Sequence, residues 1–260
     1  MNILQAVILG IVQGLTEFLP ISSQAHLFLV PYLLGWDYQG LDFDIALHWG
    51  TLLAVLLVFG KDYWRYLRAL FSGGQENQKM EKRMAWFLFL GSLPAAFAGF
   101  LAKDLAETLL RNPIIMVVTL SAFGLLLWVA DRFLQRSERS ELDAGKALAI
   151  GIAQAVAIIP GVSRSGSTIT AALFFGLGRE AATRFSFLLS GPIIFGAGLV
   201  AMRDFTGISA ALVAGFLAAA ISGFAAIKFL LRFVSRNSFN VFVWYRILLA
   251  AAVLAVVLYR

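Results

Sequence analysis

Long apolar segments alternate with short polar ones along the whole chain. Six of them are rich in Leu, Val, Ala and Phe, a pattern typical of helices that cross a bilayer rather than of barrel strands. The six predicted spans are Ile45–Phe59, Ala85–Ala102, Pro113–Ala130, Phe185–Met202, Ile208–Leu231 and Val241–Tyr259. The sequence therefore predicts a polytopic helical membrane protein.

Two further apolar regions are each interrupted by a polar stretch. Met1–Leu19 stops at Pro20, because the residue before a proline is disfavoured in a helix, and the apolar run Leu27–Leu34 follows. Ala147–Ile159 and Ile169–Leu177 flank the second interruption in the same way. We interpret each region as a pair of half-helices that meet inside the membrane.

Each broken pair is followed by three predicted spans, so the chain contains one pattern twice. Because three is odd, the second copy is expected to lie inverted relative to the first. We predict an all-α polytopic fold with one membrane domain, 1–260, built as repeat 1 (about 1–130), a connector (131–146) and repeat 2 (about 147–260).

Short local matches support this duplication. Gly10-Ile11-Val12-Gln13 resembles Gly151-Ile152-Ala153-Gln154. Pro20-Ile21-Ser22-Ser23 resembles Pro160-Gly161-Val162-Ser163, but the spacing from the glutamine differs by one residue. Chance similarity among residues common in membranes is the alternative explanation.

Composition supports a membrane protein and removes other classes. Hydrophobic residues make up 60% of the chain and charged residues only 14%, against about 25% charged in soluble domains. The absence of cysteine excludes disulfide and thiolate chemistry. The net charge of +6 is explained by cytoplasmic loops and lipid headgroups, so no nucleic-acid partner is expected. The first residues lack a basic segment and a cleavage site, so we expect no removable signal peptide.

The distribution of Lys and Arg predicts which connections face the cytoplasm. The basic segments, placed inside, are a loop at 61–83, the connector 131–146, the turn at 179–184 and the stretch 228–236. The acidic segment 37–44, the short connection 103–112 and the turn Arg203-Asp204 then lie outside. This assignment alternates consistently when the first broken pair enters from outside and the second from the cytoplasm.

Arg164 is the residue that departs most from the apolar pattern. It lies between Pro160 and Thr168, among three serines, a threonine and two glycines. An arginine at membrane depth costs several kcal/mol and by default marks a functional site. Glycine backbone N–H groups, hydroxyls and the positive end of a helix starting near Ser165 form a cradle for an anion. We interpret this stretch as a phosphate-binding loop; a polar turn outside the membrane is the alternative.

The first broken pair supplies complementary groups. Gln13 and Glu17 are four residues apart and share a helix face. A buried Glu17 needs Arg164, His26 or a metal ion as its partner. A carboxylate, an imidazole, hydroxyls and an arginine together suit phosphoryl transfer, and carboxylate and amide oxygens suit Mg²⁺ or Ca²⁺. The nucleophile is left open among a hydroxyl, the imidazole and a water that His26 activates.

These residues alone do not distinguish phosphoryl transfer from other functions. Inverted repeats with broken helices also build secondary transporters, in which Arg164 would bind an anionic substrate without cleaving it. A flippase for a lipid carrier is a second alternative. A scaffold protein does not explain a buried Arg, Glu and His together. His48 is expected to be an interfacial residue and is not chosen as a site residue, although a place near the site is left open.

Two segments together resemble one known family. Gln13-Gly14-Leu15-Thr16-Glu17-Phe18-Leu19-Pro20-Ile21-Ser22-Ser23, followed by His26, and Pro160–Thr168 are similar to the motifs of the bacterial undecaprenyl-pyrophosphate phosphatases, also called bacitracin-resistance proteins. The similarity covers the whole chain in length and layout. It implies a multi-pass enzyme of the cell inner (cytoplasmic) membrane, with interlocked inverted repeats and an active site facing the periplasm.

The resemblance also implies an activity. The expected reaction removes the terminal phosphate of undecaprenyl pyrophosphate, which recycles the lipid carrier for peptidoglycan synthesis and gives bacitracin resistance. The expected cofactor is a divalent cation, Mg²⁺ or Ca²⁺. The expected partners are the polyprenyl pyrophosphate and membrane lipid, and the formation of a homodimer is left open.

The resemblance assigns roles to individual residues. The family's acidic motif falls on Gln13 and Glu17, which are expected to hold the metal. The expected catalytic residues are Glu17, Ser23, His26 and Arg164. The expected substrate-binding residues are Ser22, Ser163, Arg164, Ser165, Gly166 and Thr168. Gln13 stands where many members have Glu, which removes one charged ligand from the metal site.

Overall fold

The computed structural model is built from helices. It describes residues 2–37, 40–72, 78–101, 112–134, 141–201 and 207–258, and these ranges contain no strand. Six helices are long and apolar enough to cross a membrane: α3 (Leu41–Phe71), α4 (Lys79–Leu101), α6 (Pro113–Val129), α9 (Arg179–Ala201), α10 (Ala210–Val234) and α11 (Asn240–Leu258). The predicted all-α polytopic class is confirmed, and each predicted span falls on one of these helices.

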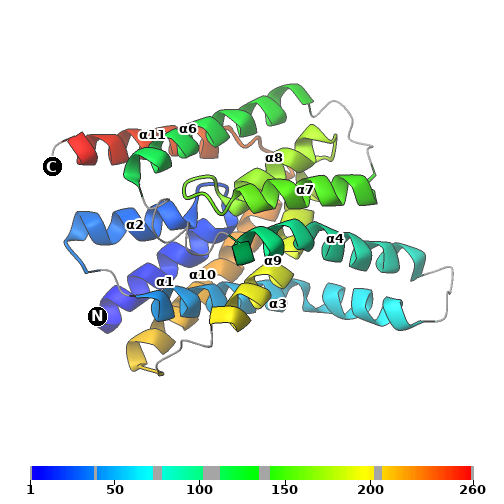
Figure 1. Ribbon diagram of the computed structural model, residues 1–260, viewed down its shortest axis with the longest axis horizontal. Helices are drawn as coiled ribbons and strands as arrows, with labels where there is room; N and C mark the ends of the chain where they lie inside the picture. The colour runs from blue at the N-terminus through cyan, green and yellow to red at the C-terminus, as the bar shows by residue number, and fades with distance from the viewer. Residues whose placement is uncertain are drawn as a thin grey trace.

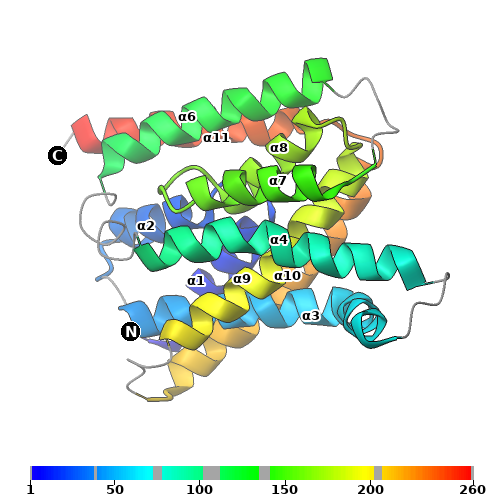
Figure 2. The same cartoon turned by 45° about the vertical axis from the view of Figure 1, so that its right-hand side comes forward.

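Four short helices form the two broken pairs. They are α1 (Ile3–Phe18), α2 (Ser23–Leu34), α7 (Ala144–Val156) and α8 (Arg164–Phe174). The longest, α1, has 16 residues and is about 24 Å long, which is less than the roughly 30 Å of a hydrocarbon core. In two views, α6 and α11 lie side by side along one edge of the molecule, α3 lies at the opposite edge, and α7 and α8 lie between (Figures 1 and 2).

Local sequence explains where the broken pairs begin and end. Asn2 caps α1 through a reciprocal pair of hydrogen bonds with Gln5. Asp143 caps α7 by accepting from the backbone N–H of Lys146 at 2.9 Å. This bond is the main reason that the pKa of the exposed Asp143 carboxyl is lowered. Leu19, which precedes Pro20, leaves the helical conformation as predicted and ends α1.

The two halves of the chain pack reciprocally. In each half, the first half-helix packs along the second span of the other half: α1 along α10, and α7 along α4. Glycines allow these close approaches, because a side chain at Gly10 would meet the Gly215 carbonyl and one at Gly151 would meet Gly91. This packing is the kind that interlocked repeats require, while their inverted relation stays a prediction.

The structure corrects the register of the repeat. Ser22 and Ser163 are the only non-glycine residues with positive φ among the described residues, at 71° and 72°. Each lies nine residues after its glutamine, Gln13 or Gln154, so no offset is needed. The sequence match aligned Pro20 with Pro160 and so paired Ser22 with Val162. That pairing was wrong, because Gly161, and not Pro160, occupies the position equivalent to Pro20.

A second correction concerns the loop expected at 61–83. The helix α3 continues to Phe71, so Lys61, Arg65 and Arg68 lie on it. Arg65 and Arg184, the latter on α9, both bond to the buried Asp62. The predicted connection 103–112, except Asn112, and the turn Arg203-Asp204 lie outside the described residues.

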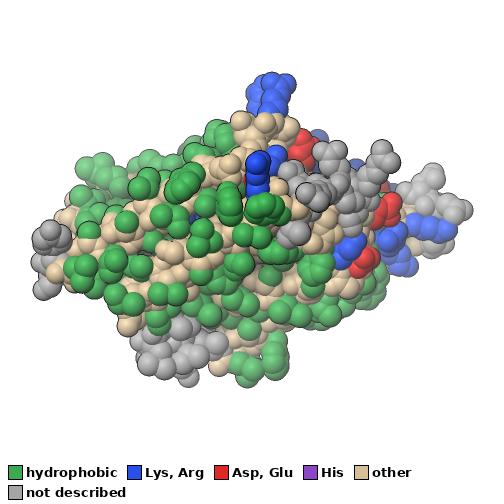
Figure 3. Space-filling view, turned by 90° about the horizontal axis from the view of Figure 1, so that it is seen from above, with side chains coloured by type: hydrophobic (Ala, Val, Ile, Leu, Met, Phe, Trp, Pro, Cys, Tyr) green, Lys and Arg blue, Asp and Glu red, His purple; other side chains and the backbone are tan. Residues whose placement is uncertain are grey.

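Charged side chains gather at one end of the molecule. Seen from above, most of the Lys, Arg, Asp and Glu on this face lie over one half, while the other half is hydrophobic (Figure 3). Buried Asp131 lies in the short π-helical turn η2 (Ala130–Leu134) and links it to α9 and to the residue before α11. Its oxygens accept from Arg179 Nε at 2.5 Å and from the Phe239 backbone N–H at 2.9 Å.

Candidate active site

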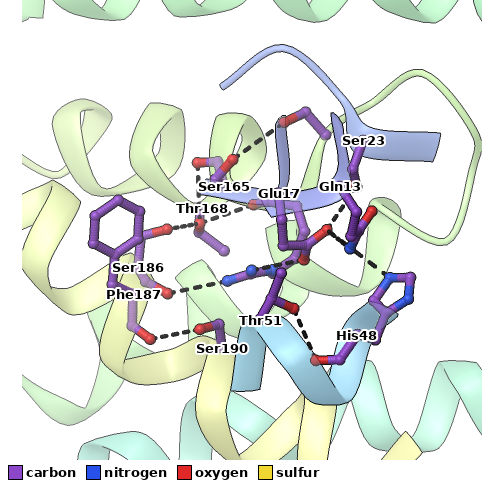
Figure 4. Close-up of polar contacts among 12 residues, drawn as sticks. Gln13, Glu17, Ser23, His48, Thr51, Ser165, Thr168, Ser186, Phe187 and Ser190 are labelled. Atoms are coloured by element: carbon purple, nitrogen blue, oxygen red, sulfur yellow. Dashed lines mark hydrogen bonds and ion pairs between the residues drawn. The ribbon is translucent and has the colours of Figure 1, made fainter. Parts of the chain in front are cut away.

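The two breaks meet around an ion pair between Glu17 and Arg164. Glu17 lies at the end of α1 and Arg164 is the first residue of α8, so one comes from each broken pair. The Arg164 Nη2 donates to Glu17 Oε1 at 2.9 Å, and both side chains are largely buried, at 13% and 7% exposed. Figure 4 shows Glu17 at the centre of the polar contacts drawn. The predicted meeting of the carboxylate and the guanidinium is therefore present.

The second oxygen of the Glu17 carboxylate collects hydrogen-bond donors from the first broken pair. Glu17 Oε2 accepts from Gln13 Nε2 at 3.1 Å and from Ser23 Oγ at 2.6 Å. A serine hydroxyl bonded to a carboxylate can be activated as a nucleophile, because the carboxylate can accept its proton. The carboxylate is thus held between an arginine on one oxygen and a serine and an amide on the other.

The start of α8 is organised by hydroxyl groups. Ser163 caps the helix, because its Oγ accepts from the Gly166 backbone N–H at 3.1 Å. Ser165 Oγ donates to the Leu19 carbonyl at 3.1 Å and so ties the second break to the first. Thr168 Oγ1 lies 2.7 Å from Ser186 Oγ on α9. The hydroxyls of Ser163, Ser165 and Thr168 are predicted to bind substrate. Because each already has a hydrogen-bond partner in the protein, each also helps to fix the shape of the loop.

In the described part of the chain, the His26 ring is hydrogen-bonded to groups other than the Glu17 carboxylate. Its Nδ1 lies 2.7 Å from the Ser22 carbonyl oxygen, and its Nε2 lies 2.7 Å from the Tyr245 hydroxyl on α11. Since a carbonyl only accepts, Nδ1 carries the proton and Nε2 accepts from Tyr245. The His26 and Tyr245 rings are also stacked. Ser22 itself is buried and makes no capping bond with its side chain.

Sequence reasoning left out two residues that contact the predicted site. The His48 Nε2 lies 3.9 Å from Glu17 Oε2, so His48, which was not among the expected site residues, lies beside the site. Its position one turn before an apolar segment did not reveal this approach. Arg246 was not considered, although an arginine within the apolar segment Val241–Tyr259 is the same signal that singled out Arg164.

The donor set for a metal ion is small. The described residues contain no group of three or more His, Cys, Asp and Glu side chains that could hold a metal. However, Gln13 Oε1 is buried beside Glu17 and has no hydrogen-bond partner. A buried polar atom of this kind is normally satisfied by water, an ion or a ligand. One carboxylate and one amide oxygen are compatible with Mg²⁺, which usually keeps waters and binds substrate phosphates.

Comparison with known proteins places the chain in a family. Residues 6–252 match the model of the family described as bacitracin resistance protein BacA. The chain belongs to this family. The expectation raised by its two motifs is confirmed.

Similar curated proteins extend over the full chain. The undecaprenyl-diphosphatase of Desulforudis audaxviator is 48% identical over 100% of both chains. Those of Moorella thermoacetica and Pelotomaculum thermopropionicum are 47% and 46% identical, over 98% of this chain and 98% and 96% of their own. In this member of the BacA family, the Glu17–Arg164 pair thus lies in a chain similar to named diphosphatases along its whole length.

Proposed function

We propose that this protein hydrolyses undecaprenyl pyrophosphate to undecaprenyl phosphate and inorganic phosphate. The observation that carries the proposal is the 2.9 Å contact between Arg164 and Glu17, which joins the two breaks. Curated relatives at 45–48% identity bear the name of this activity. The reaction recycles the lipid carrier for peptidoglycan synthesis and underlies bacitracin resistance.

Arg164 binds the pyrophosphate. Its guanidinium has five N–H donors, of which one on Nη2 donates to Glu17 and one on Nη1 donates to the Ser186 carbonyl at 3.4 Å. The three N–H groups that remain can donate to phosphate oxygens and stabilise the negative charge that develops on them. Because Arg164 is the first residue of α8, the positive end of this helix adds to the same attraction.

Ser23 is the nucleophile that the geometry favours. Its Oγ donates to Glu17 Oε2 at 2.6 Å, whereas the His26 ring is held by Ser22 and Tyr245. Ser23 Oγ bonds to the terminal phosphorus as Glu17 takes its proton. The bond from that phosphorus to the bridging oxygen breaks, and undecaprenyl phosphate leaves. Water then cleaves the phosphoserine and releases inorganic phosphate.

A divalent cation, Mg²⁺ or Ca²⁺, would be held by Glu17 and by the unpaired Gln13 Oε1. When bound, such an ion neutralises charge on the pyrophosphate oxygens. The replacement of a second carboxylate by Gln13 makes the site less negative, so phosphate oxygens of the substrate are needed to complete the set of ligands. Binding of the cation is therefore expected to be weak without substrate and stronger with it.

We propose that the protein lies in the cell inner membrane with its site open to the periplasm. The Lys and Arg side chains at one end of the bundle support this orientation, because cytoplasmic ends carry the excess of positive charge. The lipid tail of the substrate then stays in the bilayer, while its pyrophosphate reaches the buried Glu17 and Arg164.

The test is phosphate release by the purified protein from undecaprenyl pyrophosphate in detergent. We expect equal amounts of phosphate and lipid monophosphate, loss of activity with a chelator, and recovery with Mg²⁺ or Ca²⁺. Glu17→Gln removes the carboxylate charge, and Arg164→Lys keeps the positive charge but removes the planar guanidinium fork. Each should reduce kcat about 100-fold or more, because both groups act on the transition state. Arg184→Lys is the matched control, since Arg184 pairs with Asp62 elsewhere.

Two results would contradict this proposal. One is wild-type phosphate release in both Glu17→Gln and Arg164→Lys, which would contradict the roles given to these residues but not the hydrolysis itself. The other is movement of a pyrophosphate lipid across liposomes containing the protein with no phosphate released, which would instead support the flippase or transporter.

A further inference from the structure

Arg246 is a completely buried arginine in α11, with an exposed fraction of 0%. In the described part of the chain, the hydrogen bonds of its guanidinium all go to backbone carbonyls and none to a carboxylate. The acceptors are Leu120 for Nε at 3.1 Å, Pro20 for Nη1 at 3.3 Å, and Gly161, Val162 and Thr119 for Nη2 at 2.9, 3.1 and 3.3 Å. A buried charge satisfied only by carbonyls is costly to keep in an apolar helix, so its placement calls for a role.

Three of the five carbonyls that Arg246 binds belong to the breaks, Pro20 to the first and Gly161 and Val162 to the second, while the other two lie on α6. Pro20 lies two residues before Ser22, and Gly161 lies two residues before Ser163, the two serines with positive φ. These carbonyls therefore occupy equivalent places in the two breaks. A broken helix leaves carbonyls without an N–H partner from the next turn, and one guanidinium supplies donors to both breaks at once.

The same side chain lies directly against the turn that carries Arg164. A Cβ at Gly166 would come within 2.9 Å of Arg246 Nη1, so glycine at this position leaves room for the guanidinium. In the first break, the bound Pro20 lies between Glu17 and Ser23 in the chain. Arg246 thus binds the backbone two or three residues from each group of the ion pair, and the carbonyls that accept its hydrogen bonds surround its buried guanidinium.

We propose that Arg246 is a positioning residue that holds the two breaks together, so that Arg164 of one meets Glu17 and Ser23 of the other. The consequence for catalysis rests on the proposed hydrolysis, whereas the bridging of the breaks does not. Lysine cannot replace this arginine, because its single ammonium lacks the planar fork that reaches carbonyls on both sides.

The experiment compares Arg246→Lys and Arg246→Met with Val253→Ala. Val253 is 1% exposed and lies two turns further along α11, in a cluster with Leu249 and Ala250 that also includes Ala25 of the first broken pair. Its truncation lowers stability but leaves the guanidinium and its carbonyl acceptors in place. Two quantities are measured well below the melting temperature of every variant: kcat for phosphate release, and hydrogen–deuterium exchange of the backbone amides at 21–26 and 162–167.

We expect kcat to fall at least tenfold in Arg246→Lys and at least 100-fold in Arg246→Met. Exchange should rise at least tenfold at both segments together. Val253→Ala should lower the melting temperature while kcat stays within twofold of wild type and exchange at 162–167 is unchanged, so that the two segments do not respond together. If Arg246→Met does not fold, Arg246→Lys decides the question alone.

Three results would overturn the proposal: unchanged kcat and exchange in Arg246→Lys, faster exchange at only one of the two segments, or a loss of kcat with unchanged exchange. If the wild-type protein releases no phosphate, the proposed hydrolysis fails. The exchange measurement then still tests the bridge by itself.

Discussion

At the scale of single residues, the contact between Ser23 and Glu17 allows two mechanisms to be distinguished, attack on phosphorus by the Ser23 hydroxyl and attack by water. If Ser23 is the nucleophile, Ser23→Ala removes the atom that bonds to phosphorus, and we expect kcat to fall at least 1000-fold, or about 4 kcal/mol in activation free energy. Ser92→Ala is the control, because Ser92 Oγ bonds only to the Leu88 carbonyl of its own helix among the contacts described. The measurement is phosphate release, together with trapping of a phosphorylated serine by rapid acid quench.

Activity of Ser23→Ala within tenfold of wild type would argue against this role. Attack by water would then be the better explanation, and Ser23 would only orient the Glu17 carboxylate through its 2.6 Å hydrogen bond.

The two serines with positive φ make a second, independent prediction about stability. A serine at φ 71° or 72° is strained, at a cost of about 1–3 kcal/mol that glycine does not incur. Ser22 has no capping bond to lose, so Ser22→Gly should raise the free energy of unfolding by about 1 kcal/mol net. Ser163→Gly also loses the bond to Gly166, worth about 1 kcal/mol, and should be nearly neutral.

The comparison is made by thermal unfolding of both variants in the same detergent. For a chain of this length, 1 kcal/mol corresponds to about 2–4 °C in melting temperature. A lower melting temperature for Ser22→Gly than for Ser163→Gly would contradict the backbone strain that the positive φ of Ser22 implies.

At the scale of helices, close packing depends on glycines at particular positions. A methyl group at Gly10 would collide with the α10 backbone at Gly215, whereas one at Gly99 of α4 meets nothing within 4 Å. Gly10→Ala should therefore destabilise the protein by about 1–3 kcal/mol through overpacking. Gly99→Ala should stabilise it by up to about 1 kcal/mol, because alanine is the better helix former. The same shift in both variants would contradict this account of the α1–α10 interface.

Most helices of this fold could be predicted from the sequence, because apolar length and interrupting prolines act locally. Pro20 ends α1 by restricting the residue before it, and the serine-rich stretch does begin α8 at Arg164. The extension of α3 to Phe71 could not be predicted from hydropathy. Charged residues such as Lys61 mark where a helix leaves the apolar layer, and they do not mark where it ends.

At the scale of the whole molecule, the candidate site could be predicted only in part. The meeting of Glu17 and Arg164 followed from the cost of burying each alone. The partner of His26 did not, because Tyr245 lies more than 200 positions away and carries no signal of its own in the sequence. Arg246 carried such a signal, but its role depends on carbonyl oxygens, and carbonyl groups have no signature in a sequence.

Orientation in the membrane can be tested because the chain has no native cysteine, so a single introduced one reports its own position. Ile208 and Ser235 are both exposed and lie at opposite ends of α10. With positive charge on the cytoplasmic side, Ile208→Cys should react with a membrane-impermeant maleimide in intact cells. Ser235→Cys should react only after the membrane is opened. The reverse pattern would place the Lys- and Arg-rich end outside, and with it the proposed access of substrate from the periplasm would be wrong.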